Sequence, residues 1–308
     1  MPEIFPKTLI VIVGPTAIGK TALSIQLAQH FKTEILSCDS RQFYKEMTIG
    51  TAVPSTDELE AAKHHFIQNR SVFEDYNVGQ FEVDALKKIT EIFSTNSTAI
   101  MVGGSGLYID AVVKGLDSFP KVDPSIRVQL NEQLENKGIE SLQMQLKELD
   151  LKSYNTIALD NPHRLIRALE ICIGSNQPYS SFINKDKKQR KFNILKIGLE
   201  ADRSVLYDRI NQRVDLMVEA GLFEEALELH KFKDLNALQT VGYREPFAYF
   251  DGLISKEKAI EEIKKNSRRF AKRQLTWFRK DPEIVWFAYD KDFNEISKTV
   301  EQLLPIKM

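Results

Sequence analysis

The sequence predicts an α/β protein in which a parallel β-sheet is flanked by helices and interrupted by a helical insertion domain. Three observations predict this fold: a glycine-rich motif between a strand-like run and a helical pattern, short apolar runs that alternate with longer helical stretches, and a central region without a convincing strand. We expect the core to comprise residues 1–115 and 192–308, and the insertion to comprise residues 116–191.

A strand, a loop and a helix are the first elements along the chain. The apolar run from Thr8 to Val13 has the length of a buried strand, and residues 22–31 repeat apolar side chains at helical spacing. The motif between them, G-x-x-x-x-G-K-[ST], consists of Gly14, Pro15, Thr16, Ala17, Ile18, Gly19, Lys20 and Thr21. The N–H groups of such a loop, its lysine and the start of the helix favour a bound diphosphate. The motif therefore predicts a P-loop NTPase-like core, and the alternative is a glycine turn without a ligand.

Four later runs are expected to complete the sheet: residues 33–38, 98–102, 193–199 and 283–287. Because helical stretches separate them, the strands should be parallel and joined by right-handed crossovers. Ligands of such sheets lie beyond the carboxyl ends of the strands. The phosphate loop, residues 39–42 and residues 103–106 are therefore expected to surround one crevice.

The composition narrows the class of protein. Its 308 residues, 43% of them hydrophobic, can bury a large core, while a net charge of −1 leaves any nucleic-acid surface to local patches. Two cysteines, Cys38 and Cys172, provide neither a disulfide framework nor a zinc pattern. Residues 1–4 lack a signal-peptide pattern, and the apolar runs are too short to span a membrane. We therefore expect a cytoplasmic protein with no membrane contact.

The insertion is expected to be helical and partly basic. Its helical patterns cover residues 126–136, 139–149 and 162–173, and the last of them carries Arg164 and Arg167. A basic linker, residues 184–191, leads back to the core.

A second basic region lies near the end of the chain. Residues 264–280 hold eight basic residues and no acidic one. Such a helix is typical of a protein that binds nucleic acid, and the alternative is a solvated face. We expect the aromatic residues Phe270, Trp277 and Phe278 to pack this helix onto the core.

Two strand ends carry candidate chemistry. Asp39 follows the second strand beside the phosphate loop, where a carboxylate can hold magnesium or act as a general base; the alternative is a turn or helix cap. The strand 98–102 ends in Gly-Gly-Ser-Gly, where many nucleotide hydrolases and kinases have an aspartate for magnesium. Backbone amides and Ser105 suit a bound diphosphate or RNA backbone, and a plain tight turn is the alternative.

Seven ordered blocks, distributed over nearly the whole length of the chain, resemble the tRNA dimethylallyltransferases, also called the tRNA isopentenyltransferase family. The blocks are GPTAIGKT (14–21), SCDSRQFY (37–44), GTAVP (50–54), VGGSGLY (102–108), NPHRLIRALE (161–170), VGYRE (241–245) and AKRQLTWFR (271–279). The resemblance departs from the family pattern at Val53, where a lysine is usual and one basic contact is lost.

The resemblance implies transfer of a dimethylallyl group from dimethylallyl diphosphate to N6 of the adenosine 3′-adjacent to the anticodon, with magnesium as cofactor. It implies that the phosphate loop holds the leaving diphosphate, that Thr21 lies near the magnesium, and that Asp39 is the base. Ser105 would lie by the acceptor, and Arg213 would clamp the diphosphate. The implied contacts to tRNA are Asp39, Ser40, Arg41, Gln42, Ser105, Arg127, His163, Arg164, Leu165, Ile166, Arg167, Val241, Gly242, Tyr243 and Arg244.

Three other functions compete with tRNA prenylation: a P-loop nucleotide kinase, prenyl transfer to a free adenine nucleotide, and RNA binding with a vestigial phosphate loop. The Gly-Gly-Ser-Gly strand end and the basic helix argue against a kinase. The insertion favours a polymeric acceptor, the tRNA anticodon stem-loop. We expect a monomer, because the chain has to clasp that stem-loop.

Overall fold

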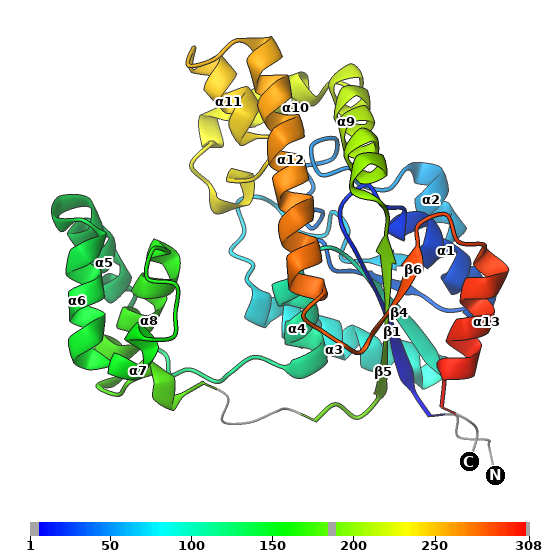
Figure 1. Cartoon of the computed structure of the whole chain (residues 1–308), viewed down its shortest axis with the longest axis horizontal. Coiled ribbons are helices and arrows are strands. Elements are labelled where there is room, and N and C mark those ends of the chain that lie inside the picture. The colour runs from blue at the N-terminus through cyan, green and yellow to red at the C-terminus, as the bar shows by residue number, and fades with distance from the viewer. Residues whose placement is uncertain (1–5, 184–188, 306–308) are drawn as a thin grey trace. The chain divides into compact units, whose positions relative to one another are not determined.

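The computed structural model describes residues 6–183 and 189–305. It divides into a core, residues up to 113 and from 190 onward, and an insertion, residues 114–189. The core contains a six-stranded parallel sheet in the order β3-β2-β4-β1-β5-β6 (Figure 1). Its strands are β1 (Thr8–Val13), β2 (Ile35–Ser37), β3 (His64–His65), β4 (Thr98–Val102), β5 (Asn193–Glu200) and β6 (Ile284–Ala288).

Five of these strands lie within two residues of the predicted bounds, and β3 was missed. The pair His64 and His65 carries no apolar run, and it is a strand because its backbone pairs with Ile35 and Leu36 of β2. The tertiary partner, not local propensity, makes this strand. The residues 1–4 and most of the basic linker, 184–188, lie outside the described residues.

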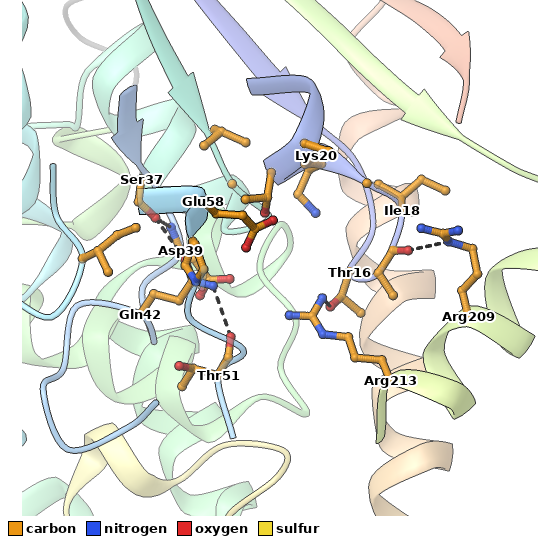
Figure 2. Close-up of a pocket in the computed structure, with 18 of the residues that line it drawn as sticks. Thr16, Ile18, Lys20, Ser37, Asp39, Gln42, Thr51, Glu58, Arg209 and Arg213 are labelled. Atoms are coloured by element: carbon orange, nitrogen blue, oxygen red, sulfur yellow. Dashed lines mark hydrogen bonds between the residues drawn. The ribbon is translucent and has the colours of Figure 1, made fainter. Parts of the chain in front are cut away.

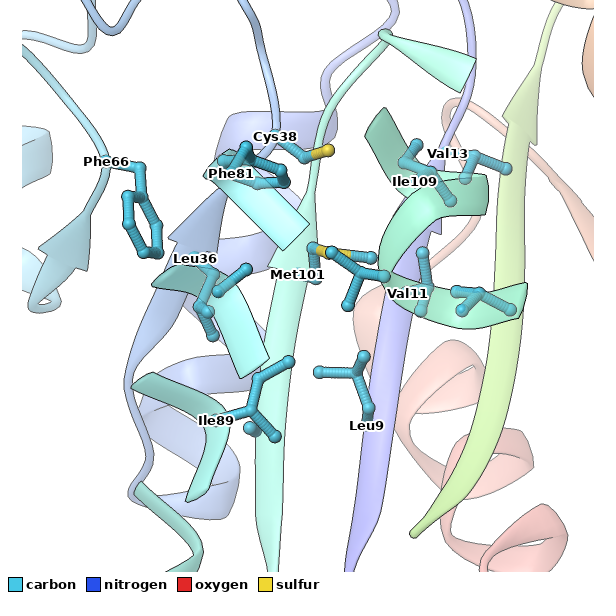
Figure 3. Close-up of a cluster of buried hydrophobic side chains, with 14 of the residues drawn as sticks. Leu9, Val11, Val13, Leu36, Cys38, Phe66, Phe81, Ile89, Met101 and Ile109 are labelled. Atoms are coloured by element: carbon cyan, nitrogen blue, oxygen red, sulfur yellow. The ribbon is translucent and has the colours of Figure 1, made fainter. Parts of the chain in front are cut away.

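The helices of the core pack on the two faces of the sheet and on one another. They are α1 (Lys20–Phe31), α2 (Thr56–Ala61), α3 (Val78–Thr95), α4 (Gly106–Lys114), α9 (Arg203–Glu219), α10 (Leu222–Leu229), α11 (Arg244–Phe250), α12 (Lys256–Phe278) and α13 (Phe293–Leu303), with short 3-10 turns η2 (His230–Phe232) and η3 (Asn236–Leu238). Because side chains alternate along a strand, Leu9 and Val11 of β1 pack under α3 and α4 (Figure 3), while Ile10 and Ile12 pack under α1 and α13. In residues 6–183 and 189–305, no helix is long and apolar enough to cross a membrane.

The insertion is helical, as predicted, with its own apolar core. Its helices are α5 (Pro124–Lys137), α6 (Ile139–Leu149), α7 (Leu151–Tyr154) and α8 (Pro162–Ser175), followed by the turn η1 (Tyr179–Ser181). The Asn161 side chain accepts a hydrogen bond from the Arg164 N–H, and Pro162 occupies the first turn. These are the residues that favour a helix start. Leu142, Leu146 and Leu169 are fully buried between α5, α6 and α8.

The chain re-enters the core at a buried ion pair. Arg190 pairs with Glu82 of α3 at 2.8 Å, and the two side chains are 9% and 8% exposed. The same guanidinium donates to the carbonyl oxygens of Ala111 and Val112 at 2.7 Å each, near the end of α4. Arg190 therefore fixes the point of re-entry to the last turn of the helix from which the insertion departs.

Replacing Arg190 with alanine should lower the free energy of unfolding by about 3–5 kcal/mol, because the Glu82 carboxylate would stay buried without its arginine. Chemical denaturation measures the loss. Lys191→Ala, which changes an exposed neighbour, is the matched control. A loss no larger than that of the control would contradict the assignment.

Candidate active site

The phosphate loop joins the carboxyl end of β1 to the start of α1. Gly14 has a φ of 145°, and a Cβ atom there would lie 2.7 Å from the carbonyl oxygen of Leu199. The loop therefore begins at a position that requires glycine. The Lys20 ammonium donates to the carbonyl oxygen of Pro15 at 2.7 Å, and its side chain points into a pocket (Figure 2).

Two adjoining pockets open beside the loop, both within the core. The first has a volume of about 400 Å³ and is lined by the phosphate loop, the ends of β2 and β4, and α9. The second has a volume of about 320 Å³ and is lined by parts of residues 39–41 and 239–244 and by α12. The residues that line both are Thr16, Ala17, Asp39, Thr51, Arg213 and Phe270. The pockets therefore share a wall that contains Asp39 and Arg213.

Asp39 and Arg213 belong to this shared wall, and Lys20 of the first pocket lies close enough to interact with both charges. The pKa of Lys20 is lowered to about 8. Burial is the main cause, the charge of Asp39 partly opposes it, and the charge of Arg213 adds to the lowering. Burial also lowers the pKa of Arg213, whose Nη1 donates to the Thr16 hydroxyl at 3.4 Å. Two cations withdrawn from water beside a loop of N–H groups favour a bound anion.

Diphosphate binding should weaken as the pH rises through about 8, the pKa of Lys20 in the free protein. A bound diphosphate raises that pKa because it stabilises the ammonium, so binding is strongest at lower pH, where Lys20 is already protonated. Above the free pKa the affinity should fall by up to about tenfold per pH unit. Calorimetric titration with pyrophosphate, in buffers of different ionisation heat, measures both affinity and proton uptake. Lys20→Arg should remove the dependence, and an affinity that does not change across pH 8 in the parent protein would contradict the prediction.

The predicted segment 39–42 lies at the end of β2, and each side chain has a different task. Asp39 lines both pockets, and its Oδ1 also accepts the Arg41 N–H at 3.1 Å, so the same side chain shapes the turn and borders the pockets. The Arg41 guanidinium donates to the carbonyl oxygens of Asn236 and Ala237 at 3.0 and 2.8 Å. Arg41, expected at the RNA, thus binds the protein's own backbone.

The Gly-Gly-Ser-Gly strand end lies against this segment. The Ser105 hydroxyl accepts the Ser40 N–H at 3.1 Å and lies 3.1 Å from the Ser40 hydroxyl. Ser105 and Ser40 both line the second pocket. The two strand ends are therefore brought together as the sequence predicted.

Sequence reasoning missed Gln274, Arg209 and Glu58. The buried Gln274 accepts the Thr16 N–H at 2.9 Å and donates to the carbonyl oxygen of Gly104 at 3.0 Å. Arg209 donates to the carbonyl oxygen of Ala17 at 2.8 Å, and Glu58 lines the first pocket (Figure 2). Gln274 could have been found from its helical spacing with the apolar Ala271 and Phe278, which marks a buried polar residue.

The basic helix α12 is only partly free of acidic partners. Lys264 pairs with Asp215 and Arg279 with Glu200, while Arg269 and Lys272 are exposed. The expected packing of its aromatic residues is right for Phe278, which is 3% exposed. It is also right for Trp277, because its ring lies directly against Gly106 and its Nε1 donates to Asp110 of α4 at 3.1 Å, although the residue is 40% exposed. It is wrong for Phe270, which is 39% exposed. Phe270 instead lines both pockets.

The segment 239–244 borders the second pocket. Val241, Gly242 and Arg244 line it. Tyr243 does not reach it, because its side chain is fully buried and its hydroxyl donates to Glu225 at 2.6 Å. Tyr243 is therefore removed from the expected RNA contacts.

The insertion carries the remaining predicted contacts. Arg127 and Arg167 both bind the buried carboxylate of Glu170, at 2.7 and 3.1 Å. Residues His163 and Arg164 are exposed. The predicted contacts Leu165 and Ile166 are 0% and 3% exposed in the core of the insertion, and this burial removes them from the set.

A P-loop α/β core with an arginine and a carboxylate on the wall between two pockets, and a lysine in the first pocket, defines a protein that handles a phosphorylated ligand and a second substrate. The family model described as IPP transferase matches residues 42–281. The chain belongs to this family of tRNA dimethylallyltransferases.

Its relatives and structural neighbours agree with this assignment. A tRNA dimethylallyltransferase of Flavobacterium johnsoniae is 60% identical over 94% of this chain and 96% of its own length, and one of Christiangramia forsetii is 61% identical over 95% and 97%. The tRNA isopentenylpyrophosphate transferase of Bacillus halodurans is 38% identical, with a TM-score of 0.71 over 96% of this chain and 95% of its own. A eukaryotic dimethylallyltransferase acting on tRNA has a TM-score of 0.82 at 27% identity over 98% of this chain and 81% of its own.

Proposed function

We propose that this protein transfers a dimethylallyl group from dimethylallyl diphosphate to N6 of the adenosine 3′-adjacent to the anticodon of tRNA. The observation that carries the proposal is the wall shared by two pockets, which contains Asp39 and Arg213, with Lys20 beside it in the first pocket. The first pocket contains the phosphate loop and suits the donor. The second is bordered by Arg273 of α12 and by Arg41 and Arg244, which suits an RNA nucleotide.

The reaction breaks the C1–O bond of the donor and forms a bond between C1 and N6. Diphosphate leaves with the electron pair of the broken bond, and Lys20, Arg213 and the loop N–H groups stabilise its charge. The amine loses one proton, which Asp39 accepts. The adenine has to leave its stack to reach Asp39, so the acceptor nucleotide is flipped out of the RNA.

A magnesium ion fits this site. Thr21 lines the first pocket beside the phosphate loop, and its hydroxyl is an oxygen ligand that suits Mg²⁺, while Asp39 is left to accept the proton. In residues 6–183 and 189–305 no group of three or more His, Cys, Asp or Glu residues could hold a metal. Such an ion would therefore depend on phosphate oxygens for much of its coordination, and when bound it neutralises charge on the diphosphate.

The deciding experiment incubates the purified protein with unmodified tRNA, dimethylallyl diphosphate and magnesium, then digests the RNA to nucleosides. Prenylated adenosine without added ATP is the expected product. Product on AMP but not on tRNA would favour the free-nucleotide alternative, and phosphate transfer from ATP would favour a kinase. No prenylated adenosine from folded protein would overturn the proposal.

We also propose that the enzyme acts as a monomer in the cytoplasm. Both pockets are lined by residues of one chain, so no second copy is needed to complete the site. Sedimentation of the protein with and without tRNA tests the stoichiometry, and a 2:2 complex would contradict it.

A further inference from the structure

The strongest unassigned cluster lies outside both pockets, around Glu225 of α10. Its Oε2 accepts the N–H groups of Thr48 and Ile49 at 2.9 and 2.8 Å. Its Oε1 accepts the Gly50 N–H at 2.9 Å and the Tyr243 hydroxyl at 2.6 Å. Three successive backbone N–H groups thus converge on one carboxylate, an arrangement that otherwise binds an external anion.

The amides bound by Glu225 belong to a tight turn, residues 48–53. Within it the Ala52 N–H donates to the carbonyl oxygen of Ile49 at 2.9 Å, and the Val53 N–H donates to that of Thr48 at 3.1 Å. A Cβ atom on Gly50 would lie 2.4 Å from the Tyr243 ring, so the turn packs directly on that side chain. Glu225 and Tyr243 together hold the turn from outside the site.

On one side, hydrogen bonds connect this cluster to the strand end that precedes Asp39. Thr51, the next residue of the turn, lines both pockets. The Gln42 amide donates to the carbonyl oxygens of Thr51 and Ala52 at 3.2 and 2.9 Å (Figure 2). Gln42 in turn accepts a hydrogen bond from the hydroxyl of Ser37 at 3.3 Å. Ser37 is the last residue of β2, and Asp39 follows it in the chain.

On the other side, Tyr243 connects this cluster to residues that line the second pocket. Tyr243 follows Val241 and Gly242, and these two residues line that pocket together with Gly50. A Cβ atom on Gly242 would lie 3.2 Å from the carbonyl oxygen of Gly50, so the turn and the segment 239–244 are in contact. The turn 48–53 and the segment 239–244, both of which Glu225 binds, therefore border the second pocket.

We propose that Glu225 is a positioning residue that fixes the acceptor side of the site by joining the turn 48–53 to the segment 239–244. This inference rests on the proposed function, in which the second pocket receives the tRNA nucleotide. The first pocket is built mainly from the phosphate loop and α9 and receives Thr51 alone from the turn 48–53, so Glu225 should affect the acceptor side far more than the diphosphate side.

Glu225→Gln tests the proposal because it keeps the shape of the side chain but removes the charge and presents an NH₂ group to backbone N–H donors. We expect KM for tRNA to rise about 10- to 100-fold, with a much smaller change in KM for dimethylallyl diphosphate, since small misplacements of a substrate are costly. Tyr243→Phe should shift the same constant in the same direction by less. Glu224→Gln, the same charge change at an exposed neighbour on α10, should change neither.

Equal changes of both KM values in Glu225→Gln, or none, would overturn the positioning role. Hydrogen exchange gives a readout that does not depend on activity: the amides of Thr48, Ile49 and Gly50 should lose protection in Glu225→Gln and keep it in Glu224→Gln. Retained protection would also overturn the proposal. If the parent protein prenylates no tRNA, the proposed function fails, and the exchange result still decides whether Glu225 holds the turn.

Discussion

Replacing Asp39 with asparagine should lower kcat for prenyl transfer by about 10²- to 10⁴-fold while leaving tRNA binding and the fold intact. A general base contributes a factor of that size, and the amide cannot accept the proton of N6. Asparagine keeps an Oδ1 atom, so it can still accept the Arg41 N–H that shapes the turn. The effect should therefore come from lost proton transfer and not from a displaced loop.

Single-turnover rates and tRNA affinity, measured on the same preparation, separate these two causes. Asp234→Asn is the matched control, because Asp234 is exposed and lines neither pocket. Weaker tRNA binding with an unchanged single-turnover rate would contradict the assignment of Asp39 as the base. An equal loss in Asp39→Asn and Asp39→Ala would agree with it, since neither side chain accepts a proton.

The phosphate loop and five strands could be predicted because their signals are local. A buried parallel strand needs a continuous apolar run, as in Thr8–Val13, and the loop needs glycine where the backbone has no room for a side chain. The short strand β3 has no such signal, because its hydrogen bonds depend on the neighbouring β2. The bounds of strands with a local signal could thus be predicted from the sequence. The strand β3, which depends on pairing with β2, could not.

The residues in and around the candidate site divide in the same way. Asp39 and Lys20 could be located beside the pockets because their motifs place them at strand and helix ends. Gln274 and Glu225 were missed because each binds distant backbone groups, Thr16 for one and the turn 48–53 for the other. Leu165 and Ile166 show the opposite error, since a block shared with a family contains residues that serve its packing as well as its site.

Replacing Arg213 with alanine should lower kcat by about 10²- to 10³-fold, the cost of removing one donor that stabilises developing negative charge. Arg213→Lys should recover only part of the rate, because lysine keeps the charge but lacks the planar fork of donors. Arg203→Ala changes an exposed arginine at the start of the same helix, and it should leave kcat unchanged.

The stability of these variants should separate the role of Arg213 from that of a structural residue. Burial lowers the pKa of Arg213, which means that the free protein holds this cation at a cost in folding free energy. Arg213→Ala should therefore unfold at a temperature no lower than the parent protein, while pyrophosphate should stabilise it much less than the parent. A variant that lost activity and thermal stability together, and gained as much from pyrophosphate as the parent, would show that Arg213 supports the fold and not the leaving group.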